Sequence, residues 1–353
     1  MMARILVGLT LAALSLGAAC AGPAKTKPPP TITNNAVAFA DVDGAPTVFS
    51  FAGLKAGKTY RDVTADAFAV DLKSGAWRAL PPLPDGRGRL ASAAVAVGRA
   101  IYVFGGYTVD ADGAEVSTAD VFAFDPRGES YRRAAAMPVP VDDSVAFVYR
   151  KRFVYLVSGW SNDGNVAAVQ IYDTTSDSWS RATDYPGTPV FGHAGGVVDR
   201  TMMIVGGVAA EKQANGRNKY AASDEAWYGE IDESDHTIIQ WRRVRTPPVK
   251  TRYRIAAVGS AQLNAIVFAG GTDNPYNYNG IGYDKRPSMP SAEVFAFDVV
   301  RGNWIVAVPK PVATMDHRGL VEWNGRFHTL GGMDKHRRAI GAVLSFDAEG
   351  VAR

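Results

Sequence analysis

Four residues able to transfer protons stand just before or at the start of apolar runs in this chain. They are His193, Asp143, Asp316 and His317. General acid/base chemistry needs two such groups within hydrogen-bonding reach of one reacting site. A catalytic role therefore requires a fold that brings at least two of them together.

Arginine and aromatic residues in comparable positions are the candidates for binding a ligand. They are Arg89, Tyr107, Trp160, Arg252, Arg254, Arg318, Tyr276 and Tyr278. A cationic bowl with aromatic walls would suit a carboxylate or a polar sugar. Its expected members are Arg254, Arg318, Arg89 and His193. Two alternatives stay open: the arginines could hydrogen-bond backbone carbonyl groups, and the insertion 274–284 could pack on itself.

Several other chemistries lack their signatures. The five histidines show no zinc-ligand spacing. The aspartate-rich segments 41–44 and 110–113 lack the later glutamate of a calcium loop. The sequence contains neither a Gly-x-Ser-x-Gly nucleophile elbow nor a Walker-type phosphate loop. We expect neither a metal ion nor a cofactor.

Six copies of one pattern must position the candidate residues. Each copy has an apolar run closing on glycine, then an apolar residue followed by aspartate, and in five copies an aromatic residue beyond it. The runs end at Ala52-Gly53, Gly105-Gly106, Ser158-Gly159, Gly206-Gly207, Gly270-Gly271 and Gly331-Gly332. The aspartates are Asp71, Asp125, Asp173, Asp232, Asp298 and Asp347, and the aromatics are Trp77, Tyr131, Trp179, Trp241 and Trp304. A period of roughly 50 residues indicates a stacked or radial repeat protein.

Each copy is predicted to form four short strands separated by turns. Repeated four-strand units fit a β-propeller, whose blades surround a central channel. The Gly-Gly pair after 101–104, Phe124-Asp125 with Tyr131, and Tyr172-Asp173 with Trp179 closely resemble kelch repeats. We therefore expect an all-β fold in residues 31–353: a six-bladed β-propeller of kelch repeats, with four antiparallel strands per blade.

The repeated residues are expected to be structural. Glycine pairs allow a positive φ without a Cβ clash, although Ala52 and Ser158 depart from that pattern. The aspartate can cap the turn that follows it, and the aromatic ring can pack between blades.

The two ends of the chain are predicted to close the ring together. The sixth copy stops near Arg353, with little length for a fourth strand, whereas residues 27–32 resemble the end of a fourth strand. An N-terminal strand just before Thr33 should therefore complete blade six and protect its open edge.

Loop lengths predict on which face a binding site lies. In four-stranded antiparallel blades, the segments that join blades and the loops between strands two and three emerge on the same face. The long loops all belong to this set: 107–118, 161–165, 208–224 and 272–291. Since binding residues gather on variable loops held by a rigid scaffold, this face is the expected binding surface.

The first residues read as an export signal. Arg4 precedes an apolar run at 5–19 that ends at Cys20, the one cysteine of the chain. Residues 16–20 resemble a bacterial lipobox, with ordinary signal-peptidase cleavage near Cys20 as the competing interpretation. We expect a signal peptide at 1–20, lipidation of Cys20, and an extended tether at 21–30. Ala21 mildly favours the outer membrane, with the propeller in the periplasm.

Two classes of function are compatible with these features. The first is a cell-envelope propeller that binds a glycan or a protein partner through its loop-rich face. The second follows from resemblance to bacterial periplasmic N-acetylneuraminate epimerases, also six-kelch propellers, and implies a sugar mutarotase. Copper-radical oxidases on kelch propellers need a cysteine that this mature fold lacks. A net charge of +3 without a dense basic face gives no sign of a nucleic-acid partner, and we expect a monomer whose only membrane contact is the lipid anchor.

Overall fold

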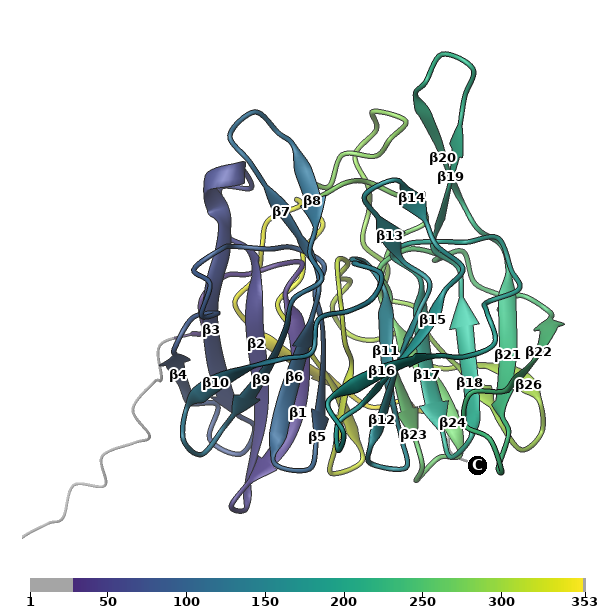
Figure 1. Cartoon of the computed structure of the whole chain (residues 1–353), viewed down its shortest axis with the longest axis horizontal. Helices are drawn as coiled ribbons and strands as arrows, with labels where there is room; N and C mark the ends of the chain where they lie inside the picture. Colours follow the sequence, from purple (N-terminus) through teal and green to yellow (C-terminus); the bar gives the residue numbers. More distant parts are fainter. Residues whose placement is uncertain (1–27, 352–353) are drawn as a thin grey trace, which may run out of the picture.

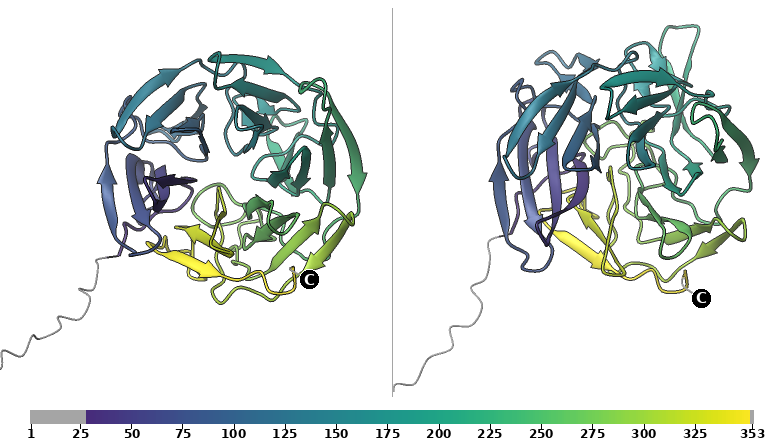
Figure 2. Two further views of the ribbon diagram at one scale, coloured as in Figure 1. Left: turned by 90° about the horizontal axis from the view of Figure 1, so that it is seen from below. Right: turned by 60° about the horizontal axis from the view of Figure 1, so that its bottom comes forward.

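The computed structural model describes residues 28–351, which form a ring of six blades around a central channel (Figure 2). The predicted leader, Cys20 and residues 21–27 of the tether lie outside this range. The described residues contain no α-helix and a single 3-10 turn, η1 (Tyr60–Asp62). The prediction of an all-β six-bladed propeller is confirmed.

Five blades are four-stranded antiparallel sheets in which the first strand lies innermost. Blade one consists of β1 (Ala36–Val42), β2 (Ala45–Leu54), β3 (Val63–Asp71) and β4 (Trp77–Leu80). Blade two consists of β5 (Ala93–Val97), β6 (Ala100–Phe104), β9 (Val121–Asp125) and β10 (Ser130–Ala134). Blade three consists of β11 (Val145–Tyr149), β12 (Phe153–Val157), β15 (Val169–Asp173) and β16 (Ser178–Arg181). Blade four consists of β17 (Ala194–Val198), β18 (Thr201–Val205), β21 (Ala226–Ile231) and β22 (Ile239–Val244). Blade five consists of β23 (Ala256–Ser260), β24 (Ala265–Ala269), β25 (Val294–Asp298) and β26 (Asn303–Val306).

The second glycine of each motif ties its blade to the next one. Its backbone N–H donates to a carbonyl in the segment that enters the following blade, as from Gly106 to Val141 O at 3.2 Å. A Cβ on the preceding Gly105 would lie 2.2 Å from the same carbonyl oxygen, which explains the glycine there. Ala52 and Ser158 occupy the first position of their motifs with φ of 54° and 55°. These departures therefore keep the left-handed bend that the motif requires.

The N-terminal segment closes the ring against blade six. This blade has three strands in the described residues: β27 (Val321–Trp323), β28 (Arg326–Leu330) and β29 (Val343–Phe346). Gly332 N donates to Ile32 O at 3.0 Å, the sixth equivalent of the inter-blade bond, and Ile32 N donates to Ile340 O at 3.2 Å. The expected closure at residues before Thr33 is thus seen as an isolated antiparallel bridge, not as a full strand ladder.

The repeated aromatic and aspartate residues have the structural roles predicted for them. Tyr131 packs on Phe124 of its own blade, with ring centroids 4.8 Å apart, and reaches Phe51 of blade one at 6.5 Å. Asp232 Oδ1 accepts the backbone N–H of Ser234 at 2.9 Å, which caps the turn after the third strand. Both features stabilise blades and their packing.

The long loops emerge together on one face, as expected. Figure 1 shows three hairpins rising from the same side of the ring. They are β7 (Tyr107–Val109) with β8 (Glu115–Ser117), β13 (Trp160–Ser161) with β14 (Gly164–Asn165), and β19 (Val208–Lys212) with β20 (Asn218–Ala222). We call the side formed by these hairpins and the insertion 272–291 the hairpin face.

Because the N-terminal segment closes the ring, we expect Ile32→Ala to destabilise the fold strongly. Ile32 is buried in a cluster that includes Val37 and Leu330, so its truncation should lower the free energy of unfolding by about 2–5 kcal/mol. Urea unfolding followed by tryptophan fluorescence measures the change. Val300→Ala, at a residue 76% exposed, is the control. Equal stability of the two variants would contradict this closure.

Candidate binding site at the channel mouth

Each innermost strand begins just after one residue with a left-handed backbone. The six residues are Asn34, Ala91, Asp143, Gly192, Arg254 and Asp316, with φ between 49° and 70°. Their backbones are joined from blade to blade: Asp143 N donates to Ala91 O at 3.0 Å, Gly192 N to Asp143 O at 2.8 Å, and Arg254 N to Gly192 O at 2.8 Å. We call these six residues the axial ring. Non-glycine residues rarely adopt such a φ, so the ring is a specific feature of the channel mouth.

The charged members of the axial ring form a buried ion-pair network. Arg254 Nη1 lies 2.9 Å from Asp316 Oδ1, and its Nη2 lies 2.7 Å from Asp143 Oδ2. Arg318 Nη2 approaches Asp143 Oδ1 at 2.6 Å. The side chains of Arg254, Asp143 and Asp316 are at most 2% exposed. Burial alone would raise the pKa of Asp143, but the charges of Arg254 and Arg318 outweigh it and hold that pKa below its usual value.

Neutral polar groups complete the network. Thr33 Oγ1 donates to Asp316 Oδ2 at 2.6 Å, and Arg318 Nη2 donates to Asn34 Oδ1 at 2.9 Å. Arg254 and Arg318 therefore both bind carboxylate groups, and Arg318 also binds the Asn34 amide. The channel mouth brings Arg254 and Arg318 together as predicted, but it is charge-balanced and not a cationic bowl.

Arg89 and Arg252 do not belong to this network. Arg89 is buried within the ring body, where it pairs with Asp85 and hydrogen-bonds Thr118 Oγ1 at 3.1 Å. Arg252 pairs with Asp224 at 3.0 Å and also donates to backbone carbonyl groups. Both residues precede the left-handed bend by two positions, so the bend separates them from the axis. The prediction that Arg89 joins Arg254 and Arg318 in a bowl is therefore wrong.

The two candidate histidines line the upper end of the channel. His193 Nε2 donates to Val157 O at 2.9 Å, and His317 Nε2 lies 2.8 Å from Thr314 Oγ1. Burial lowers the pKa of His193 to about 4 and that of His317 to about 3, so both rings are neutral near pH 7. The four acid/base candidates lie near the channel mouth. The two carboxylates among them, those of Asp143 and Asp316, are bound to arginine.

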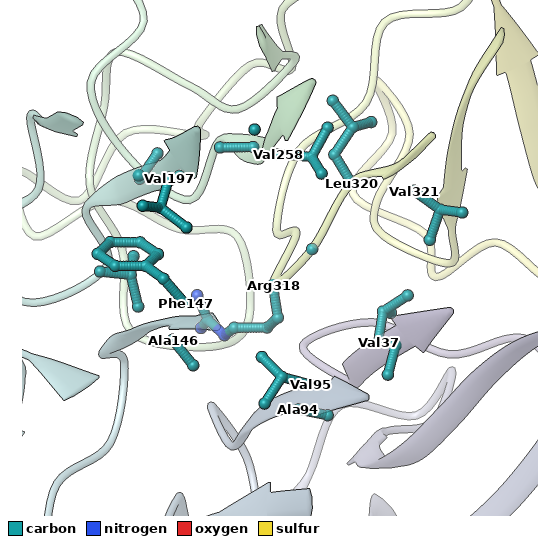
Figure 3. Close-up of a pocket in the computed structure, with 18 of the residues that line it drawn as sticks. Val37, Ala94, Val95, Ala146, Phe147, Val197, Val258, Arg318, Leu320 and Val321 are labelled. Atoms are coloured by element: carbon teal, nitrogen blue, oxygen red, sulfur yellow. The ribbon is translucent and has the colours of Figure 1, made fainter. Parts of the chain in front are cut away.

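The channel is lined by apolar side chains and by polar groups of the innermost strands. It encloses about 390 Å³ between the innermost strands of all six blades. Figure 3 shows Arg318 among apolar side chains such as Val95, Phe147 and Leu320. The ion pairs of the axial ring lie where the segments that enter the innermost strands meet this channel.

The insertion 272–291 covers the hairpin-face end of the channel. Tyr276 is fully buried, and Tyr253 Oη donates to its carbonyl oxygen at 2.8 Å. Tyr278 packs in a cluster with Leu54 and Tyr107. Tyr276 is thus buried against residues outside the insertion and is not an accessible stacking surface.

A small pocket beside this cover contains Tyr107 and Trp160, two of the predicted binding residues. It encloses about 80 Å³ and is lined by Tyr107, Glu115, Ser117, Asp142, Asp143, Trp160, Phe191, Tyr220, Asn277 and Tyr283. We call it the acidic aromatic pocket. Tyr220 of β20 stacks on Tyr283 of the insertion with ring centroids 4.0 Å apart. Sequence reasoning did not single out Glu115, Asp142 or Tyr220 as site residues, because three different blades bring them together.

Residues 28–351 offer neither a metal-binding cluster nor a membrane-spanning helix. No group of three or more histidine, cysteine, aspartate or glutamate residues there is arranged to hold a metal ion. No helix in this range has the length and apolar character needed to span a membrane.

Comparisons with known proteins agree with the fold. Residues 40–271 match the family model described as KLHDC2/KLHL20/DRC7 Kelch-repeats domain. Kelch-like protein 15 of Mus musculus is 25% identical over 260 residues, which cover 70% of this chain and 39% of that protein. Kelch-like protein terF of Aspergillus terreus is 29% identical over 183 residues, 50% of this chain and 38% of that protein. The chain thus spans about two fifths of the length of the curated relatives it matches.

A solved structure extends the likeness to the whole ring. The structure titled "Structure of YjhT" superposes with a TM-score of 0.72 at 15% identity, covering 91% of this chain and 97% of that one. At this identity the similarity concerns the fold alone.

The ion-pair network predicts that Arg254→Met is strongly destabilising. The substitution leaves Asp316 buried without a cation and Asp143 with one arginine, and it should cost about 3–5 kcal/mol. Arg252→Met breaks a pair whose aspartate is 83% exposed and should cost about 0–1 kcal/mol. Denaturant unfolding of both variants checks this, and similar losses in the two would contradict the assigned role of Arg254.

Proposed function

Because the chain belongs to the kelch-repeat family, we propose that it is a binding module that holds a protein or glycan partner on its hairpin face. The observation that carries this proposal is the acidic aromatic pocket, which blades two to five build together. Loops held by a rigid scaffold are the usual place for binding residues.

The hairpin face supplies both a fixed floor and a variable rim. Asp142 pairs with Trp160 through two backbone hydrogen bonds of 2.9 Å, which ties the pocket to the axial ring. Asn277 Nδ2 donates to Glu115 Oε1 at 2.7 Å and links the insertion to the β7–β8 hairpin. A surface organised in this way loses little conformational entropy when a partner binds.

We place the module in the cell envelope on the basis of the export signal expected at residues 1–20. Lipidation of Cys20 would tether the propeller to the outer membrane on its periplasmic side. The partner would then be an envelope protein or a cell-wall glycan.

Sugar mutarotation, the alternative, draws less support from the geometry. Its acid and base would come from His193, Asp143, Asp316 or His317. Asp143 and Asp316 are bound to arginine, and the two histidines line the channel with pKa values that burial lowers. Fold similarity does not by itself carry an activity to this chain.

The proposal predicts that Trp160→Ala combined with Tyr220→Ala abolishes partner binding. Both rings line the pocket, and their removal should weaken binding by more than about tenfold, since aromatic residues often dominate interfaces. Binding to a glycan and cell-wall array would detect a carbohydrate partner. A photo-cross-linker at position 219 would capture a protein partner in intact cells. The control changes the exposed outer-strand residue Val306 to alanine and places a second cross-linker at 308.

Signal that survives the double substitution, or cross-links confined to position 308, would contradict the proposal. Acceleration of N-acetylneuraminate anomerisation by the protein, with loss of that effect in His193→Ala, would instead establish the mutarotase.

A further inference from the structure

Asp142 is a buried carboxyl group without a cationic partner among the described residues. It is 4% exposed, and Ser117 Oγ donates to its Oδ2 at 2.7 Å. The neighbouring Asp143, by contrast, is bound by Arg254 and Arg318. Within residues 28–351, no lysine, arginine or histidine forms an ion pair with Asp142. Glu115, at the rim of the same pocket, accepts the amide of Asn277 and likewise has no cationic partner in that range.

The surroundings of Asp142 favour a positive ligand. Burial, reinforced by the charge of Asp143, raises its pKa well above the usual value. A buried carboxylate is costly unless it is paired with a cation. A cation in the pocket would lower this pKa again, would pair with the ionised carboxylate of Asp142 and would also face Glu115.

Aromatic side chains form most of the remaining walls. Trp160 meets Phe191 edge to face with centroids 5.7 Å apart, and Phe191 meets Tyr220 at 6.0 Å. Tyr283 stacks on Tyr220 and is thereby fixed at the pocket. Several ring faces around one site attract an organic cation, and the attraction grows when water is excluded.

Size limits what the pocket can hold. Its volume of about 80 Å³ is well below that of clefts that enclose drug-sized ligands, which run to about 300–1,000 Å³. A compact head group fits such a space, whereas most of a larger ligand would remain outside.

We propose that the acidic aromatic pocket binds an alkylammonium group, supplied either by a lysine side chain of a partner or by a free amine. This inference rests on the proposed function, since it names the chemistry recognised on the same face. A carboxylate would be repelled by Glu115 and Asp142. A sugar hydroxyl brings no positive charge to Glu115 or to the carboxyl of Asp142.

The first test compares three probes of similar size and different charge. The full chain is titrated with n-butylammonium, n-butanol and butyrate at constant ionic strength, and heat is recorded by isothermal calorimetry. Saturable binding of n-butylammonium alone is expected. A lysine-containing peptide and its acetyl-lysine counterpart then distinguish the sources: tighter binding of the lysine peptide indicates a partner side chain, and equal affinity of peptide and free amine indicates a small-molecule ligand. Equal binding of butanol and butylammonium, or no binding of either, would overturn the proposal.

Variants locate the site. Asp142→Asn removes the charge and keeps an acceptor for Ser117, and Tyr220→Leu removes one ring face from a hairpin outside the blade sheets. Each should weaken n-butylammonium binding by about tenfold or more. Glu211→Gln, which removes one charge from exposed β19 outside the pocket, should leave binding unchanged. If Asp142→Asn does not fold, Tyr220→Leu alone decides.

The outcomes separate this inference from the proposed function. Loss of amine binding with retained cross-links at position 219 would reject the alkylammonium ligand and keep the binding module. Amine binding that is unaffected by Asp142→Asn and Tyr220→Leu would place the amine elsewhere and reject this site.

Discussion

The guanidinium group of Arg254 is the charge on which the closed end of the ring depends. It lies on the axis and bridges carboxylates that belong to blades three and six, while its own backbone is joined to blade four. Taking these ions out of water is expensive, and their mutual attraction offsets the cost only when the geometry and hydrogen bonding are good. The left-handed backbone of the axial ring supplies that geometry, because it aims three charged side chains at one point.

The ion pairs of Arg254 also determine which carboxyl groups of the candidate site are paired with a cation. Arg254 and Arg318 neutralise Asp143, but the adjacent Asp142 forms no ion pair with any residue in the described part of the chain. The insertion then covers the axis with Tyr276 and carries Tyr283 to the hairpin of blade four. The acidic aromatic pocket lies beside this cover on the hairpin face. A binding role follows more directly from this arrangement than catalysis within the channel.

The sequence predicts the architecture well because the repeat is local. Glycine pairs, capping aspartates and inter-blade aromatics each act within one blade or between neighbours, so their spacing is sufficient to interpret them. The site depends on contacts over greater distances: Arg254 meets Asp143 and Asp316 across 111 and 62 positions of the chain. Arg89 and Arg254 look alike in the sequence, yet only Arg254 occupies the left-handed position itself. Stacking of Tyr220 on Tyr283 likewise depends on contact between the β19–β20 hairpin and the insertion 272–291. The sequence of either segment alone does not predict that contact.

A double-mutant cycle between Arg254 and Asp316 tests the central claim most directly. The stabilities of Arg254→Met, Asp316→Asn and the double variant give the coupling energy of the pair. We expect a coupling of about 2 kcal/mol or more, with Asp316→Asn recovering stability in the Arg254→Met background, because the unpaired buried carboxylate has been removed. Losses that add to within about 0.5 kcal/mol would show that the two side chains act independently, and would contradict a ring held together at its axis by Arg254.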